Sequence, residues 1–143
     1  MLTLYIVKSG DPNAQNQGLI ESFGEDISIP SAIQAVRFNQ IHSLKAITTW
    51  YGVFYDNEII DIQLRESLRI FLTNEILIDV YTVMKKHIDK ESSFGYRFTQ
   101  APRFFRSEIQ ISPDGLRPMK KEGIRYERIL NGFIVPQNDS NTI

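Results

Sequence analysis

The residues best suited to chemistry lie in the run TTWYGVFYDNEIID, residues 48–61, where an apolar and aromatic stretch leads directly into carboxylates. Asp56 and Glu58 are two residues apart where this stretch ends, so on an extended chain their side chains point to the same side. Carboxylate oxygens suit hard divalent cations. The spacing therefore predicts a Mn²⁺ or Mg²⁺ site made by Asp56 and Glu58.

The same residues allow a purely structural interpretation. Asp56-Asn57 tolerates positive φ and could form the turn of a two-residue hairpin, with the residues on either side pairing as strands. An amphipathic helical pattern begins directly after Asp61, however, and a hairpin would use residues 58–62 as a second strand. The sequence favours a strand that leads into a helix and leaves the hairpin open.

Other residues could contact a ligand. Ser9 and Asp11 follow the first apolar run and could touch a phosphate, although the single glycine between them is far from a phosphate-binding loop. Trp50 could offer a platform for a sugar ring, and core packing is the alternative. Arg103, beside two phenylalanines, could bind a phosphate or single-stranded nucleic acid, or it could be solvated or paired with an acid.

Composition narrows the classes of protein. The chain has 143 residues and 42% hydrophobic residues, which predicts one packed domain at 1–135 and a flexible polar tail at 136–143. The net charge of −1 makes nucleic acid an unexpected partner, and the N-terminal apolar run is too short for a membrane span. There is no cysteine, and the two histidines lack zinc-site spacing. These features fit a cytoplasmic protein, or a particle component if a virus encodes the chain.

The elements that would position these residues alternate along the chain. Strands are predicted at 2–9, 46–55, 75–86 and 103–112, and helices at 31–44 and 62–73. Polar connections are predicted at 13–30 and 87–100, and a helix then a strand, or two strands, at 125–136. This order predicts an α/β fold with a mixed sheet and helices packed on it. The hairpin interpretation would favour an α+β fold.

Residues 36–72, VRFNQIHSLKAITTWYGVFYDNEIIDIQLRESLRIFL, resemble the centre of family 2 glycosyltransferases of the GT-A fold. In that family an Arg-Asn helix leads into an aromatic strand, an Asp-x-Asp or Asp-x-Glu element ends the strand, and an amphipathic helix follows. The segments DVYTVMKK (79–86) and APRFFRS (101–107) are similar to later parts of such enzymes. The resemblance spans about residues 31–107 and implies a compact GT-A-like sheet.

The resemblance implies that the chain binds a nucleotide-sugar or glycan and transfers a hexose. A divalent cation would neutralise the charge that develops on the leaving diphosphate. Asp56 would be the metal ligand, and Glu58 would be its partner or its support. Whether the chain is an enzyme stays open.

The remaining site residues also come from this resemblance. Arg37 would contact a phosphate or the nucleotide through its guanidinium fork. Asn39 belongs to the same helix, one residue further from Arg37 than in the family's adjacent Arg-Asn pair. Asp89 and Glu91 are the only candidates for a general base.

One departure from the family changes the expected function. If residues 2–11 correspond to the family's second strand, the first strand is missing and the nucleotide pocket is half built, so a homo-oligomer or an assembly partner would have to complete it. The alternative function is a non-catalytic structural or interaction protein of a virus particle or larger assembly that retains the fold. A small acyltransferase-like or nucleic-acid-associated domain, which the hairpin would favour, ranks last.

Overall fold

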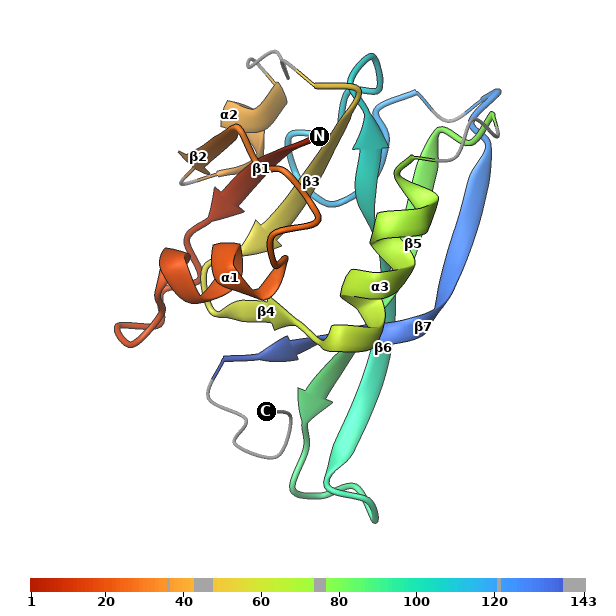
Figure 1. Cartoon of the computed structure of the whole chain (residues 1–143). Coiled ribbons are helices and arrows are strands. Elements are labelled where there is room, and N and C mark those ends of the chain that lie inside the picture. Colours follow the sequence, from red (N-terminus) through yellow and green to blue (C-terminus); the bar gives the residue numbers. More distant parts are fainter. Residues whose placement is uncertain (36, 43–47, 74–76, 121, 138–143) are drawn as a thin grey trace.

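A computed structural model describes residues 1–35, 37–42, 48–73, 77–120 and 122–137 of the chain (Figure 1). The elements in chain order are β1 (Leu2–Val7), α1 (Asn16–Ser22), β2 (Ser31–Ala35), α2 (Phe38–His42), β3 (Trp50–Tyr55), β4 (Glu58–Ile60), α3 (Ile62–Phe71), β5 (Val80–Ile88), β6 (Tyr96–Arg106) and β7 (Tyr126–Pro136). None of the described helices is long and apolar enough to cross a membrane.

All seven strands belong to one mixed sheet in the order β2-β1-β3-β6-β5-β7-β4. The strands β2, β1 and β3 are mutually parallel, and β6 lies antiparallel between β3 and β5. Beyond β5, β7 is parallel to it and the short β4 pairs antiparallel with β7. The sheet curls into a half-barrel, with α1 and α3 in front of it in Figure 1. The predicted α/β class, a mixed sheet with helices packed on it, is confirmed.

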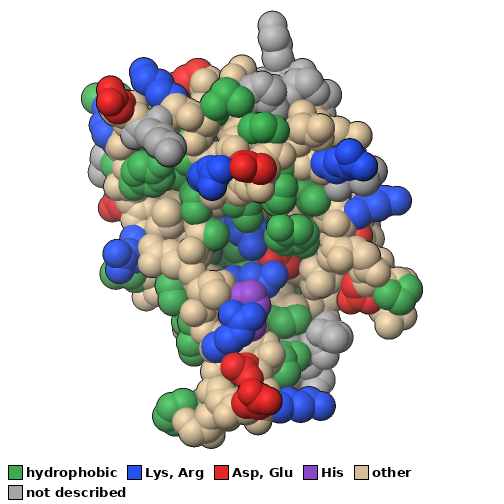
Figure 2. Space-filling model, turned by 180° about the vertical axis from the view of Figure 1, so that it is seen from behind, with side chains coloured by type: hydrophobic (Ala, Val, Ile, Leu, Met, Phe, Trp, Pro, Cys, Tyr) green, Lys and Arg blue, Asp and Glu red, His purple; other side chains and the backbone are tan. Residues whose placement is uncertain are grey.

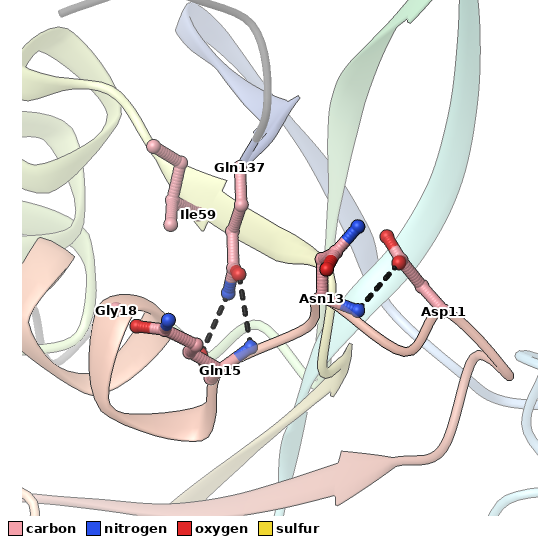
Figure 3. Close-up of a pocket in the computed structure, with 6 residues that line it drawn as sticks. All are labelled: Asp11, Asn13, Gln15, Gly18, Ile59 and Gln137. Atoms are coloured by element: carbon pink, nitrogen blue, oxygen red, sulfur yellow. Dashed lines mark hydrogen bonds between the residues drawn. The ribbon is translucent and has the colours of Figure 1, made fainter.

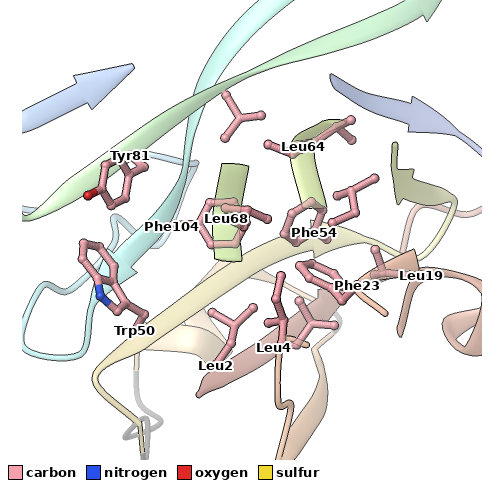
Figure 4. Packing of buried hydrophobic residues seen from close by; sticks show 14 of the residues in the cluster. Leu2, Leu4, Leu19, Phe23, Trp50, Phe54, Leu64, Leu68, Tyr81 and Phe104 are labelled. Carbon is pink, nitrogen blue, oxygen red and sulfur yellow. The ribbon is translucent and has the colours of Figure 1, made fainter. Parts of the chain in front are cut away.

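The main hydrophobic core fills the space between the sheet and these two helices (Figure 4). Its largest members, all at most 2% exposed, are Leu2, Leu4, Leu19, Phe23, Trp50, Phe54, Leu64, Leu68, Tyr81 and Phe104. A second cluster, which includes Tyr5, Tyr51 and Phe105, covers the other face of the sheet. Because both faces are covered, β1 and β3 are buried along almost their whole length, which explains why their sequences are continuously apolar.

The segment after β3 forms no hairpin with it. Residues 58–60 are a strand, β4, but β4 pairs with β7 through Glu58↔Pro136. A two-residue hairpin turn of the Asp-Asn kind needs positive φ, and among the described residues only glycines have positive φ. The helix then begins where predicted, since Asp61 caps α3 by accepting a hydrogen bond from the N–H of Leu64 at 2.8 Å.

The predicted helix at 31–44 is wrong in its first half. Residues 31–35 form β2, which lies in parallel register beside β1, and only Phe38–His42 are helical. Tertiary pairing decides this, because a free edge of β1 is available there and the apolar spacing fits either element. Residues 43–44 of the predicted helix and 46–47 of the strand predicted at 46–55 lie outside the described residues. Residues 48–49 are described and are not in a strand, and β3 begins at Trp50.

Both predicted polar connections contain regular structure. The first, residues 13–30, holds the short helix α1, which buries Leu19 in the core. The second, residues 87–100, is wrong as a connection, because β5 and β6 continue through it as a long antiparallel ladder that ends at the pair Ile88↔Tyr96. Its polar composition reflects a two-stranded ribbon that is open to solvent. We call residues 85–99 the arm; it projects from the lower end of the body in Figure 1.

Three predicted boundaries also change. Residues 75–76 of the strand predicted at 75–86 lie outside the described residues, and the strand observed here is Val80–Ile88. The strand predicted at 103–112 is Tyr96–Arg106. Where a helix then a strand, or two strands, were predicted at 125–136, the structure has one strand, β7 (Tyr126–Pro136), and no helix. Pro136 ends this strand and Gln137 is hydrogen-bonded to the body, while residues 138–143 of the predicted tail lie outside the described residues.

Candidate functional site

The carboxyl ends of β1 and β3 form a topological switch point. The chain leaves β1 toward β2 on one side and later returns to β3 on the other side of β1. In open α/β sheets, a crevice that binds ligands opens where neighbouring strands lead away in opposite directions. Ser9 follows β1 and Asp56 follows β3, so the sheet brings these two predicted residues together although they are 47 positions apart.

Asp56 is held at this edge by the residues after β1. Its Oδ1 accepts a hydrogen bond from the backbone N–H of Ser9 at 3.0 Å and another from the Ser9 hydroxyl. Its own N–H donates to the carbonyl of Val7 at 3.0 Å. Ser9 is also the link to Asp11, whose N–H donates to the Ser9 hydroxyl at 3.2 Å. Three of the predicted site residues thus form one connected group.

A hollow of about 460 Å³ adjoins this group (Figure 3). Its lining consists of Asp11, Asn13, Gln15, Gly18, Ile59 and Gln137. Figure 3 shows Asp11 and Asn13 at one end, where the N–H of Asn13 donates to Asp11 Oδ1 at 2.9 Å. At the other end the Gln137 amide donates to the carbonyls of Gln15 and Asp56, each at 2.8 Å. The hollow is therefore open to solvent and lies between the segment 11–18, Ile59 of β4 and Gln137.

Glu58 occupies a different environment from Asp56. It is fully buried, and its two oxygens accept hydrogen bonds from the Arg103 guanidinium at 2.7 and 2.9 Å. Lys85 Nζ lies 2.5 Å from Oε2, and the N–H of Tyr55 donates to Oε1 at 2.6 Å. Burial alone would raise the pKa of Glu58, but Arg103 and then Lys85 outweigh it and hold the pKa below its usual range.

These contacts bear on the two roles predicted for Glu58. Its carboxylate is engaged by two cations and a backbone N–H, and through Tyr55 it fixes the turn that carries Asp56. Burial and these partners favour support of Asp56 over direct ligation of a metal. Asp56 and Glu58 were predicted to point to the same side and share a ligand. Among the described residues their hydrogen-bond partners differ, since Asp56 contacts Ser9 and Glu58 contacts Arg103.

Arg103 is also committed inside the protein. It is 3% exposed, and besides Glu58 its Nη1 donates to the carbonyl of Val53 at 3.1 Å. Its guanidinium lies 5.5 Å from the ring centre of Phe54 and 5.7 Å from that of Tyr55. Arg103 therefore corresponds to the predicted alternative of an arginine paired with an acid. It holds Glu58, which in turn accepts a hydrogen bond from the N–H of Tyr55 beside Asp56.

Trp50 lies far from Asp56. It begins β3 whereas Asp56 follows the end of that strand, a separation of about 20 Å along an extended chain. Its ring is 2% exposed, packs 5.1 Å from the Tyr81 ring and has the Arg106 guanidinium 4.7 Å above it. These contacts correspond to the alternative of core packing, and the structure does not bring Trp50 together with the other site residues.

Arg37 and Asn39 lie at the same edge as Ser9. Both are exposed and follow the carboxyl end of β2, the strand beside β1. The N–H of Lys8 donates to the carbonyl of Ala35 at 3.1 Å, which ties the ends of these two strands together. Arg37 therefore lies at the same edge of the sheet as Ser9, and its N–H donates to Gln40 Oε1.

Asp89 and Glu91 lie in the connection at the end of the arm. The N–H of Glu91 donates to Asp89 Oδ1 at 3.1 Å, and the N–H of Asp89 donates to the carbonyl of Gly95 at 2.8 Å. These bonds shape the turn between β5 and β6. Figure 1 shows this turn at the far end of the arm, so the structure does not bring these acids beside Asp56.

Sequence reasoning missed the roles of Lys85, His87 and Gln137 at this edge. Lys85 and His87 belong to a basic run that reads as wet surface, yet Lys85 bonds to Glu58 and His87 Nε2 lies 2.6 Å from the Thr99 hydroxyl. Their spacing of two in a strand was a usable signal for a shared face. Gln137 carried no signal, because its contacts depend on how β7 crosses beside β4.

Metal ligation by protein groups alone is limited here. Within the described residues, no group of three or more His, Cys, Asp or Glu side chains could hold a metal ion. The donors at the edge are Asp56 and Asp11, and Mg²⁺ or Mn²⁺ is commonly held by one or two carboxylates together with ligand phosphates and water. Asp56 and Asp11 alone therefore do not make a complete cation site. No protein-family model, curated protein or solved structure matches the chain.

Proposed function

We propose that the chain binds a nucleotide-sugar, or another nucleoside diphosphate ligand, in the crevice between the carboxyl ends of β1 and β3. The observation that carries this proposal is the meeting of Ser9 and Asp56 at the topological switch point of the sheet. An exposed hydroxyl and a carboxylate are not needed for packing at this edge of the sheet. Their presence at the switch point therefore supports a polar binding site.

The divalent cation belongs to the same proposal. Among the described residues, hydrogen bonds engage only Oδ1 of Asp56, which leaves Oδ2 as a ligand oxygen, and Asp11 stands next in the same loop. The cation would supply charge neutralisation for a diphosphate. Ser9 orients Asp56, Glu58 fixes the turn from below, and Arg37 at the neighbouring strand end supplies a guanidinium for phosphate oxygens.

Thermal or chemical unfolding tests the proposal. Mn²⁺ together with uridine or guanosine diphosphate should stabilise the protein, by about 2.7 kcal/mol when the ligand is at a hundred times its Kd. Asp56→Asn should lose the part of this stabilisation that depends on Mn²⁺. Asp26→Asn, at an exposed acid between α1 and β2, is the matched control and should behave as wild type. Equal stabilisation of wild type and Asp56→Asn, or none at millimolar ligand, would overturn the proposal.

Transfer of a hexose is the second step of the proposal, and it has its own test. Transfer needs the donor held rigidly, because a misplacement of about 1 Å can cost about a hundredfold in rate. The open hollow beside Asp11 gives a ligand few walls, so we expect the monomer to release little nucleoside diphosphate from sugar nucleotides with Mn²⁺. Turnover should rise when a second copy or a partner completes the pocket. Efficient turnover by the monomer would contradict this step and leave binding intact.

The arm favours a second candidate function, a non-catalytic binding role in a larger assembly. Phe94 at its end is 86% exposed and Phe98 is 49% exposed, which is unusual for large aromatic side chains. Size-exclusion chromatography with light scattering tests assembly of the chain with itself. A concentration-dependent oligomer that Phe94→Ser dissolves would support this function, and a monomer at all concentrations would count against self-assembly.

A further inference from the structure

One face of the arm brings two basic side chains, a histidine and a hydroxyl together. In the β5–β6 ladder, Lys85 is opposite Thr99 and His87 is opposite Arg97. Opposite residues of an antiparallel pair share a face, and residues two apart on one strand do so as well. His87 Nε2 lies 2.6 Å from the Thr99 hydroxyl, which confirms the shared face. We call Lys85, His87, Arg97 and Thr99 the arm strip.

The arm strip lies on the same side as the buried Glu58 network. Lys85 joins the two, since its Nζ is 2.5 Å from Glu58 and 5.5 Å from the Tyr55 ring centre. Seen from behind, Lys, Arg and His side chains run in a file from the middle of the face down to the arm (Figure 2). Because β5 runs in the same direction as β3, the arm extends beyond the carboxyl edge where Asp56 lies.

In the immediate surroundings of His87, positive charge exceeds negative charge. The charged groups that act on His87 are the cations Lys85, Arg97 and Arg103 and the single carboxylate of Glu58. That carboxylate is already shared between Arg103 and Lys85. Within the described part of the chain, no ion pair gives Arg97 a carboxylate partner. Burial and then the neighbouring cations lower the pKa of His87, as expected where the local potential is positive.

We propose that the arm strip binds the phosphate group of a small phosphorylated ligand without a metal ion. Arg97 offers a planar fork of donors, Lys85 a second charge, Thr99 a hydroxyl and His87 an imidazole that becomes a donor and a cation when it takes up a proton. A phosphate dianion would balance the excess of cations around His87. This site does not rest on the proposed function at Asp56, because it uses other residues and needs no divalent cation.

The two histidines of the chain make the proposal directly measurable by NMR. The C2–H signals of His42 and His87 are followed between about pH 5 and pH 8 in inorganic phosphate and in chloride of equal ionic strength. His87→Gln assigns the signals. Bound phosphate stabilises the imidazolium, so the pKa of His87 should be higher in phosphate than in chloride. The same His87 pKa in both salts would overturn the proposal.

Variants separate a built site from a general charge effect. Arg97→Gln should weaken phosphate binding about tenfold, the usual loss when one charge-assisted contact of about 1.4 kcal/mol is removed. Lys86→Gln removes the same charge from the other face of β5, where Lys86 Nζ lies 3.7 Å from the Tyr96 ring centre, and should leave binding unchanged. If Lys86→Gln weakens binding as much as Arg97→Gln, the arm strip is not a site.

Two further experiments identify the ligand and test whether the arm strip binds phosphate independently of Asp56. If a nucleoside monophosphate binds more tightly than inorganic phosphate, the protein also contacts the nucleoside. If the two bind equally, the protein recognises the phosphate alone. Both results support the site. Asp56→Asn should leave phosphate binding unchanged with chelator present. Loss of phosphate binding in Asp56→Asn would overturn the arm strip as a separate site.

Discussion

Replacement of Glu58 by glutamine tests how the edge of the sheet is held together. The side chain of Glu58 is 1% exposed, and its two cationic partners are 4% exposed at Arg103 and 19% exposed at Lys85. Glutamine keeps the shape of the side chain and an acceptor for the N–H of Tyr55, but it removes the charge. Two cations then remain beside each other in a poorly hydrated place. Removing one partner from a buried ion pair costs about 3–5 kcal/mol.

Urea unfolding followed by the fluorescence of the single tryptophan, Trp50, measures this cost. Against a typical domain stability of about 5–15 kcal/mol, the expected loss of about 3–5 kcal/mol is a large shift of the midpoint. Glu66→Gln is the matched control, because the Glu66–Arg69 pair leaves both side chains 50% exposed and should be worth less than about 1 kcal/mol. Equal costs for the two variants would refute the buried network.

The pH dependence of the same two proteins checks the charge directly. The pKa of Glu58 is lowered in the folded state and has its ordinary value when the chain is unfolded. Its contribution to stability is therefore present above the ordinary carboxyl pKa and is lost as the pH falls through the lower, folded value. Glu58→Gln should show a shallower loss of stability in acid than wild type. Identical slopes would show that Glu58 is not held as a buried anion.

Two further predictions rest on local geometry, and a third rests on the lowered pKa of His87. Gly132→Ala should lower the free energy of unfolding in urea by about 3 kcal/mol or more, because φ is +104° and the new Cβ would lie 2.1 Å from the Leu64 nitrogen. The control Gly123→Ala, at φ +73° with open space around it, should lower it by only about 1 kcal/mol. Equal losses would contradict the close approach of Gly132 to Leu64. Asp61→Ala should remove the cap of α3 and cost about 1 kcal/mol by the same assay, and no change would show that the cap is dispensable. The lowered pKa of His87 means that the unfolded chain takes up this proton first as the pH falls, so stability should decline just below about pH 6.5, and His87→Gln should remove that part of the decline.

The parts of the fold that could be predicted from the sequence are those fixed by local pattern. The buried strand that became β3 is apolar and aromatic throughout, and α3 has a capping aspartate and an apolar stripe. The segments that failed are those in which tertiary pairing decided between elements. The apolar spacing of residues 31–35 also fits an amphipathic helix, but in the structure they pair with β1 as a parallel strand. The arm was missed because the sequence HIDKESSFGYRFTQ (87–100) is mostly polar and has no clear alternation of apolar and polar residues.

The candidate site divides in the same way. Asp56 was predictable, because a carboxylate directly after a buried strand lies at the edge of a sheet. Its contact with Ser9 was not, since strand order is decided by packing between distant segments. The spacing of Glu58 from Asp56 suggested equal roles, but Arg103 and Lys85 come from two other strands and turn Glu58 into a buried anion. No local pattern could reveal those partners.

The most direct test of the central claim, a metal and diphosphate site at the carboxyl edge of β1 and β3, is paramagnetic broadening by Mn²⁺ in NMR spectra recorded with uridine diphosphate. Bound Mn²⁺ should erase the amide signals of Ser9, Asp11 and Asp56, and the lone indole signal of Trp50 at the opposite end of β3 should survive. Asp56→Asn should restore the lost signals. Broadening that spares Ser9 and Asp56, or that affects the Trp50 indole equally, would contradict a site at this edge.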